Sequence, residues 1–373
     1  MTVSLMKALG LYIHVPFCIR KCPYCDFYSV ALREDLRDHY VHALQQCLSF
    51  YRDPDYAVDT VYFGGGTPSL LSPEDIDAIL SAASRSFSFQ NPEVTMEVNP
   101  STVTLDKLSG YHRAGVNRLS FGVQSFNDDE LKDLGRLHDA KTAEEAVNTA
   151  KRAGFRNISA DLMLGISRQT EDTLQKTLHT VGQLDLQHIS AYMLSVEPNT
   201  PYARMKDRLL LPNEDKVTDL YLMTVNVLKD FGFSQYEISN FSKPGFESRH
   251  NLKYWNLEEY LGLGPSAHSL FHNRRAYFPE KLDGFLSMAE TGSFSMLEEG
   301  SFDPAEEYVM LSLRLCEGLH FSRAEALGID VTELLEKAQP FLAQNLLSTK
   351  GDRLFFTKKG FLVSNTVISE LMP

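Results

Sequence analysis

The chain has 373 residues, of which 43% are hydrophobic and 23% are charged, as expected of a globular protein with one large domain and a smaller one. Its 36 basic and 49 acidic residues give a net charge of −13, which argues against nucleic acid or anionic membranes as partners because both require a basic face. No segment has the apolar length of a membrane span, the start lacks a signal-peptide core, and an odd number of cysteines suits a reducing compartment, so we expect a cytoplasmic protein.

Apolar runs typical of strands alternate with helical patterns from residue 10 to about residue 240. Strands are predicted at residues 11–15, 60–63, 94–98, 118–123, 158–162 and 189–194. Helices are predicted at 34–50, from the N-cap sequence Ser72-Pro73-Glu74 onward, and near 104–114, 140–153, 170–183 and 213–231. Strict alternation predicts a parallel sheet with helical crossovers, and six repeats fit either a partial barrel or a doubly wound sheet.

Residues with reactive or polar side chains follow the predicted strands. Three cysteines come after the first strand and a run of glycines after the second, while Glu97, Gln124 and Asp161 stand at or just beyond the ends of the third, fourth and fifth. Barrels collect their functional residues at the C-terminal ends of their strands. The pattern therefore favours an α/β fold with a partial (β/α)6 barrel over residues 1–240.

The remainder of the chain divides into two parts. Residues 241–300 belong to a connecting segment rich in aromatic residues, glycine and histidine, without a clear period. From 301 to 373 we predict a winged-helix-like α+β module, with helices near 303–316, 322–327 and 331–343, a hairpin within 346–356 and a last helix from Lys358. Such modules often bind DNA, but the acidic composition favours a packing or lid role here.

Cys18, Cys22 and Cys25 form a C-x3-C-x2-C pattern. Three thiolates at this spacing can bind three irons of a [4Fe–4S] cluster and leave the fourth iron open for a small molecule. Structural zinc is the alternative, but zinc frameworks usually have a second pair of ligands, and the sequence shows none. Cys47 and Cys316 lie in apolar surroundings and are predicted to be core residues.

The sequence Gly64-Gly-Gly-Thr67-Pro68 follows a strand, and consecutive glycines let a ligand approach the backbone. It lacks the Lys-Ser/Thr of a phosphate loop and the spacing of the dinucleotide fingerprint. Together with Tyr12-Ile-His-Val-Pro-Phe-Cys18 and Cys22-Pro-Tyr-Cys25, it resembles the glycine and cluster loops of the radical S-adenosylmethionine (SAM) superfamily. Within that superfamily the chain resembles the oxygen-independent coproporphyrinogen III oxidase branch over nearly its whole length.

The resemblance implies that the three cysteines bind a [4Fe–4S] cluster and that the amino and carboxylate groups of SAM bind its open iron. Acceptors, donors and an arginine suit the ammonium, carboxylate and ribose of SAM. The implied SAM contacts are Tyr12 beside the cluster, Tyr24 near adenine, Gly65, Gly66 and Thr67 along the methionine part, and Glu97, Gln124, Arg136 and Asp161 on the remaining polar atoms.

The chain departs from the oxidases at one position of the cluster loop. The oxidases carry a fourth cysteine two residues after the third, where this chain has Phe27, and they use a longer N-terminal segment. Both differences put porphyrinogen oxidation in doubt.

The sequence His250-Asn-Leu-Lys-Tyr254-Trp255 matches the H-N-x-x-Y-W motif of the HemW-type heme chaperones. The resemblance implies heme binding, with His250 as the iron ligand. Tyr254 and Trp255 are suited to stack on the porphyrin, and Arg249 to meet a propionate. Two alternatives stay open: a buried polar loop with a hydrogen-bonded His250, and ligation by His268 or His272 instead.

The leading hypothesis is a heme chaperone that binds heme, a [4Fe–4S] cluster and SAM and transfers heme to an acceptor such as a respiratory haemoprotein. The second hypothesis is a radical SAM enzyme acting on a porphyrinogen, and the third is a structural zinc protein. The sequence leaves open the heme acceptor, the covalency of heme attachment, the cleavage of SAM and the oligomeric state, a homodimer included.

Overall fold

The structure, a computed structural model, describes residues 6–372. Its largest feature is a twelve-stranded sheet whose centre consists of the six predicted parallel strands. In spatial order these are β1 (Lys7–Val15), β4 (Tyr56–Gly65), β5 (Ser88–Val98), β6 (Arg118–Gln124), β7 (Asn157–Leu164) and β8 (His188–Met193). Among the described strands β1 does not pair with β8, so the barrel is open, and the predicted fold class is confirmed.

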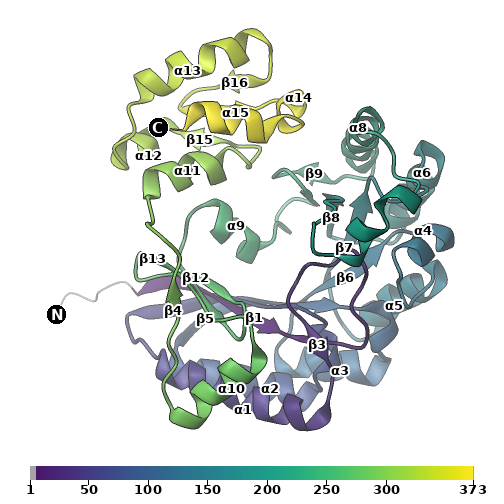
Figure 1. The fold of residues 1–373 in the computed structure, drawn as a ribbon, viewed down its shortest axis with the longest axis vertical. Coiled ribbons are helices and arrows are strands. Elements are labelled where there is room, and N and C mark those ends of the chain that lie inside the picture. Colours follow the sequence, from purple (N-terminus) through teal and green to yellow (C-terminus); the bar gives the residue numbers. More distant parts are fainter. Residues whose placement is uncertain (1–5, 373) are drawn as a thin grey trace.

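Helices cover the outer face of these strands (Figure 1). The predicted helices are confirmed as α1 (Glu34–Phe50), α2 (Pro73–Ser86), α3 (Leu105–Ala114), α5 (Ala140–Arg152), α6 (Glu171–Gln183) and α8 (Glu214–Asp230). Most begin at a polar N-cap side chain that accepts a backbone hydrogen bond, a contact that typically stabilises by about 1 kcal/mol. None of the helices within residues 6–372 is both long enough and apolar enough to cross a membrane.

Short strands, most of them antiparallel to their neighbours, extend the sheet at both edges. β10 (Asn240–Ser242) and β9 (Ser234–Gln235) follow β8. On the other side β11 (Tyr260–Leu263) pairs in parallel with β1, and β12 (His268–Phe271), β13 (Arg274–Tyr277) and β14 (Leu297–Glu298) follow it. The segment 241–300 thus contributes strands to the barrel sheet as well as α9 (Arg249–Trp255) and α10 (Leu282–Thr291). The domain division at 240 and 300 stays a prediction.

The short helix α9 lies between the inner face of the sheet and the C-terminal module (Figure 1). A Cβ at Gly10 of β1 would meet the side chain of Lys253 at 3.0 Å and that of His250 at 3.2 Å, so the glycine allows α9 to pack against the strand. Lys253 is buried and forms an ion pair of 2.9 Å with Asp59, which compensates its burial. The helix therefore packs against the inner face of β1, β4 and β5.

The C-terminal module contains the predicted helices and hairpin. They are α11 (Pro304–Ser312), β15 (Leu319–His320), α12 (Phe321–Ala326), α13 (Val331–Ala343), β16 (Leu347–Thr349), β17 (Arg353–Phe356), α14 (Lys358–Phe361) and α15 (Ser364–Leu371). The strands form a separate sheet in the order β15-β17-β16. A backbone bridge between Glu237 and Leu315 and a hydrogen bond of 2.7 Å from Arg323 to the Asn256 carbonyl attach the module to the barrel.

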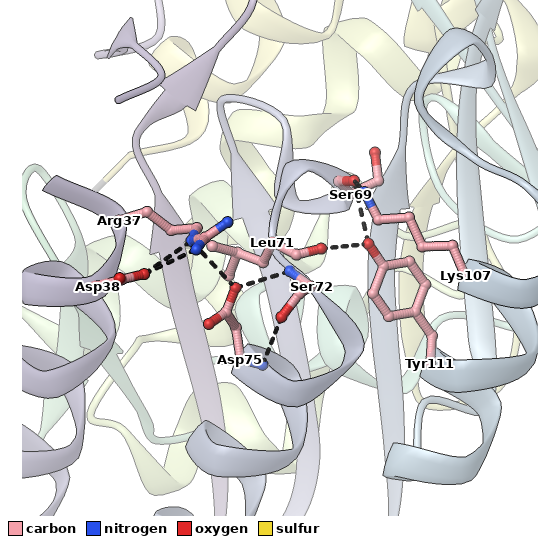
Figure 2. Close-up of polar contacts among 8 residues, drawn as sticks. All are labelled: Arg37, Asp38, Ser69, Leu71, Ser72, Asp75, Lys107 and Tyr111. Atoms are coloured by element: carbon pink, nitrogen blue, oxygen red, sulfur yellow. Dashed lines mark hydrogen bonds and ion pairs between the residues drawn. The ribbon is translucent and has the colours of Figure 1, made fainter. Parts of the chain in front are cut away.

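The segment that follows β4 is held by α3. The Tyr111 hydroxyl donates to the carbonyls of Ser69 and Leu71, at 3.1 and 2.6 Å, and the Lys107 ammonium donates to the Ser69 carbonyl at 2.7 Å; Figure 2 draws these contacts. Ser69 lies in the 3₁₀ turn η1 (Pro68–Leu70), directly after the glycine run. These bonds fix the C-terminal side of that run.

The start of α2 is fixed by a reciprocal cap. The Asp75 backbone N–H donates to the Ser72 hydroxyl, and the Ser72 N–H donates to the Asp75 carboxylate (Figure 2). The same carboxylate lies 3.6 Å from the Arg37 guanidinium of α1. Helices α1, α2 and α3 are thereby linked at the end of the sheet that carries the glycines.

Candidate functional site

The three clustered cysteines line a single cavity of about 440 Å³ at the C-terminal ends of the parallel strands. Cys18 ends β2 (Phe17–Cys18), which pairs with β3 (Val30–Ala31), and the Cys25 N–H donates to the Cys22 carbonyl at 3.1 Å. We call residues 16–28 the cluster loop. All three thiols are free and partly exposed. Cys47, by contrast, is fully buried in α1, as predicted for a core residue.

Polar groups surround the sulfurs of the cluster loop. The Arg136 guanidinium lies 3.6 Å from the Sγ of Cys22 and 3.4 Å from the Tyr24 hydroxyl, and it donates to the Gly122 carbonyl at 2.6 Å. Its Nε is buried and has no partner among the described residues. The hydroxyl of Thr67 lies 3.6 Å from the Sγ of Cys18. A cation and a hydroxyl next to thiols suit a site for thiolates and an anionic ligand.

The glycine run packs against the cluster loop backbone to backbone. The N–H groups of Gly66 and Thr67 donate to the carbonyls of Val15 and Phe17 at 2.8 and 2.7 Å. A Cβ at Gly66 would approach those two carbonyl oxygens to 2.8 and 2.7 Å, closer than any side chain allows. Gly65 has a φ of +104°, which favours glycine. The two loops thus form one continuous wall of the cavity.

Two carboxylates also line the cavity, Glu97 beside the glycine run and Asp161 beyond it on β7. Glu97 accepts hydrogen bonds from the Tyr62 hydroxyl at 3.0 Å and from the Gly65 N–H at 3.2 Å, and Asp161 accepts one from Ser120 at 2.9 Å. Burial and the nearby Asp161 raise the pKa of Glu97 to about 8, and burial likewise raises the pKa of Asp161. A pair of carboxyl groups that is costly to ionise in the free protein is suited to receive a cationic ligand.

The smaller cavity gathers most of the residues that the sequence implied for SAM. Its lining includes Tyr24, Gly65, Gly66, Thr67, Glu97, Gln124, Arg136 and Asp161. Tyr12 lies outside this lining, on the wall of a neighbouring cavity. The donor set, the glycine wall and the orphaned Arg136 Nε fit a [4Fe–4S] cluster with SAM beside it; the individual roles stay predictions.

A larger cavity of about 990 Å³ adjoins the first. The two share part of the cluster loop, namely Lys21, Tyr24, Cys25 and Phe27. Phe27 is 67% exposed and stands where the oxidases carry their fourth cysteine. Aromatic and imidazole rings dominate the remaining wall: Tyr12, His14, Tyr28, Tyr254, Tyr260 and His268. Such a volume lies at the upper end of the range of about 300–1,000 Å³ for small-molecule sites.

His250 is fully buried beneath this cavity. Its Nδ1 lies 2.8 Å from the Thr60 hydroxyl and its Nε2 lies 2.8 Å from the Tyr254 hydroxyl. The ring stacks on Tyr62 with centroids 5.2 Å apart, and burial together with Lys253 lowers the pKa of His250 to about 3. The imidazole is therefore neutral with both nitrogens engaged. Ligation of heme by His250 stays a prediction that requires one of these two hydrogen bonds to open.

The other residues implied for heme lie in different surroundings. Tyr254 is on the cavity wall, whereas the indole Nε1 of Trp255 is buried and has no partner within residues 6–372. Arg249 faces Asp59 at 3.8 Å and the Asn91 carbonyl at 3.3 Å. His272 pairs with Asp53 at 3.0 Å, outside the lining of both cavities.

Several cavity residues were not predicted from the sequence. His14, Lys21, Tyr28 and Tyr260 were not singled out, yet all line the larger cavity. The alternation of β1 places His14 on the same side as Tyr12, so strand period could have indicated it. Tyr260 reaches the site because β11 pairs with β1, a long-range contact without a local signal.

The cluster loop and glycine loop at the mouth of an open (β/α)6 barrel define a radical SAM protein. The Radical SAM superfamily model matches residues 12–181, and the HemN C-terminal domain model matches residues 302–363. Among solved structures, coproporphyrinogen III oxidase (HemN) from Escherichia coli shares the fold with a TM-score of 0.85 and 24% identity, covering 98% of this chain and 90% of that one.

Curated relatives carry the name heme chaperone HemW. The one from Haemophilus influenzae is 41% identical over 271 residues, covering 70% of each chain. The one from Bacillus subtilis is 34% identical over 374 residues, covering 97% of this chain and 98% of its own length. The one from Escherichia coli is 41% identical over 269 residues, again covering 70% of each. The chain belongs to the HemW family, as the sequence motifs predicted.

Proposed function

We propose that this protein is a cytoplasmic heme chaperone that holds heme in the larger cavity, beside a [4Fe–4S] cluster and SAM, and transfers it to an acceptor haemoprotein. The observation that carries the proposal is the shared wall between the two cavities. Four residues of the cluster loop line both, so a ligand in the larger cavity would contact the loop that binds the cluster. The names of the curated relatives support the same function.

The smaller cavity is the proposed site of the cofactors. The thiols of Cys18, Cys22 and Cys25 would hold the cluster, and a cluster with an open iron supplies one-electron chemistry to the SAM that binds there. Arg136 would balance thiolate charge near Cys22, and Glu97 would accept a hydrogen bond from a cationic group of SAM. Gly65 and Gly66 allow the glycine run to pack closely against His14 and the start of the cluster loop, which forms this side of the cavity.

The larger cavity is the proposed site of heme. Its tyrosines offer flat apolar surface with polar ends, which suits a porphyrin. Lys21 is a cation on the wall and can pair with a propionate, whereas Asp26, Glu197 and Glu280 line the cavity with negative charge. We therefore expect one propionate to lie beside Lys21.

Titration of hemin into the anaerobic, cluster-loaded protein tests the proposal. We expect saturable binding at one heme per chain, followed by transfer to an apo-haemoprotein faster than free hemin transfers at the same concentration. A protein that binds hemin only weakly and without saturation, or that retains it in the presence of the acceptor, would rule out the chaperone function.

The same preparation decides the alternative of porphyrinogen oxidation. Phe27 leaves the cluster loop without a fourth cysteine, so we expect no conversion of coproporphyrinogen in the presence of SAM and a reductant. Formation of the divinyl product would replace the chaperone function by an oxidase function.

A further inference from the structure

The histidines of the larger cavity differ in which ring nitrogen is free. His14 is buried, with Nδ1 3.2 Å from the Tyr12 hydroxyl and Nε2 3.1 Å from the Tyr28 carbonyl. His268 is half exposed and makes one hydrogen bond, from Nδ1 to the Glu299 carboxylate at 3.0 Å. Its Nε2 has no hydrogen-bond partner among residues 6–372. Of the histidines on this wall, His268 alone has a ring nitrogen available within the described structure.

The surroundings of His268 determine which nitrogen carries the proton. A carboxylate can only accept, so in the neutral imidazole Nδ1 donates to Glu299 and Nε2 carries the lone pair. Histidines that ligate metals almost always donate their other N–H to a carboxylate, a carbonyl or water, because this fixes the tautomer and the ring orientation. The pair of His268 and Glu299 has this arrangement before any iron is present.

The ring is also held in place by the sheet extension. His268 begins β12 opposite Tyr277 of β13, and their rings stack with centroids 5.2 Å apart at 19°. Glu299 follows β14, and its N–H donates to the Arg275 carbonyl of β13 at 3.0 Å. Three strands therefore orient a side chain that is itself 49% exposed. An exposed ligand suits a cargo, because the acceptor must reach the iron to remove it.

We propose that Nε2 of His268 is the protein ligand of the heme iron in the larger cavity. This assignment rests on the proposed function, and it gives His250 a different role: it positions Tyr254 on the cavity wall through its Nε2 hydrogen bond. Glu299 is a positioning residue that acts through the His268 ring. The iron binds the imidazole lone pair without any change in the protonation of Nδ1.

Hemin titration with matched variants tests the assignment, read by the absorbance and electron paramagnetic resonance of the bound ferric heme. We expect His268→Asn to weaken hemin binding at least about ten-fold and to remove the histidine-ligation signature, with partial recovery on adding free imidazole. Glu299→Gln should weaken binding less and alter the spectrum. His272→Asn is the control: His272 is also paired with a carboxylate but lies outside the cavity, and asparagine tolerates its φ of +52°.

The outcomes separate this assignment from the proposed function. If the wild-type protein binds hemin with a histidine signature and His268→Asn keeps both signature and affinity, the assignment is wrong while the chaperone function stands. If a folded His250→Gln protein alone loses the signature, His250 is the ligand instead. If the wild-type protein binds no hemin, the chaperone function fails and the assignment fails with it.

Discussion

Replacement of His250 by alanine is the most direct test of how α9 is built into the barrel. The side chain is fully buried and neutral, and it contacts three residues of two elements: Thr60 and Tyr62 of β4, the latter by ring stacking, and Tyr254 on its own helix. The alanine variant leaves the Thr60 and Tyr254 hydroxyls without their partner and creates a void the size of an imidazole. If His250 holds the helix and the strand together, its removal should cause a large loss of stability. If its imidazole is instead held free for a ligand, the loss should be small.

The magnitude follows from these contacts. A buried polar group that loses its partner costs about 1–3 kcal/mol. Tyr254 also faces the cavity, where water can replace the lost bond, so its share lies at the low end. Loss of the stacked pair with Tyr62 adds about 0.5–1.5 kcal/mol. We therefore expect His250→Ala to lower the free energy of unfolding by about 3–5 kcal/mol.

Urea denaturation of the cluster-free protein under reducing conditions, followed by far-ultraviolet circular dichroism, measures this loss. His39→Ala provides the matched control, because His39 lies exposed on α1 and its removal should change stability by less than about 0.5 kcal/mol. His250→Gln, which can restore one of the two hydrogen bonds, should lose less than His250→Ala. A loss below about 1 kcal/mol for His250→Ala would refute the reasoning, since the buried bonds would then contribute little.

Three further perturbations test the cofactor site. Serine in place of any one of the three cluster-loop cysteines should remove the iron from anaerobically reconstituted protein, as measured by iron content. Cys47→Ser should retain the iron, and loss of iron in that variant would overturn the ligand set. The pKa of Glu97 is about 8 in the folded protein and about 4.5 in the unfolded chain, so between these pH values the folded state holds an extra proton. The contribution of Glu97 to the free energy of unfolding therefore falls as pH rises, by up to about 1.4 kcal/mol per pH unit. The difference in unfolding free energy between wild type and Glu97→Gln, measured from pH 5 to 8, should show this slope, and a flat difference would contradict it. Gly66→Ala should weaken SAM binding at least about ten-fold in equilibrium dialysis, because the new Cβ meets two backbone carbonyls. Gly284→Ala is the control and should leave SAM binding unchanged, because the space around Gly284 is open. Equal SAM affinities of the two variants would remove the glycine wall from the site.

The sequence predicted those parts of the candidate site whose residues form short local motifs or stand at the ends of strands. The cysteine triplet, the glycine run and the polar residues at strand ends were found because parallel strands place their C-terminal ends at one edge of the sheet. The smaller cavity gathers these residues. Tyr12, placed with them by resemblance, lines the adjoining cavity, which shares the cluster-loop residues Lys21, Tyr24, Cys25 and Phe27 with the smaller one.

The segment between 241 and 300 was the least predictable part of the fold. Its strands have two to four residues each, too short to show an alternating pattern, and α9 has seven. What places them is pairing with distant partners: β11 with β1, and α9 against Gly10. These contacts join residues far apart along the chain, so the composition of the segment alone does not indicate them.

The amino-acid sequence by itself determined the alternation of strands and helices, the three-thiolate loop and the family to which the chain belongs, because each depends on residues that are close together along the chain. The tertiary structure alone decided that two cavities share the cluster loop, that the motif histidine His250 is buried with both nitrogens engaged, and that His268 faces the larger cavity with Glu299 behind it. The physical reason is that burial and hydrogen-bond partnership belong to the packed chain. A histidine in a motif and a histidine in a short strand are equivalent until packing leaves one of them a free lone pair.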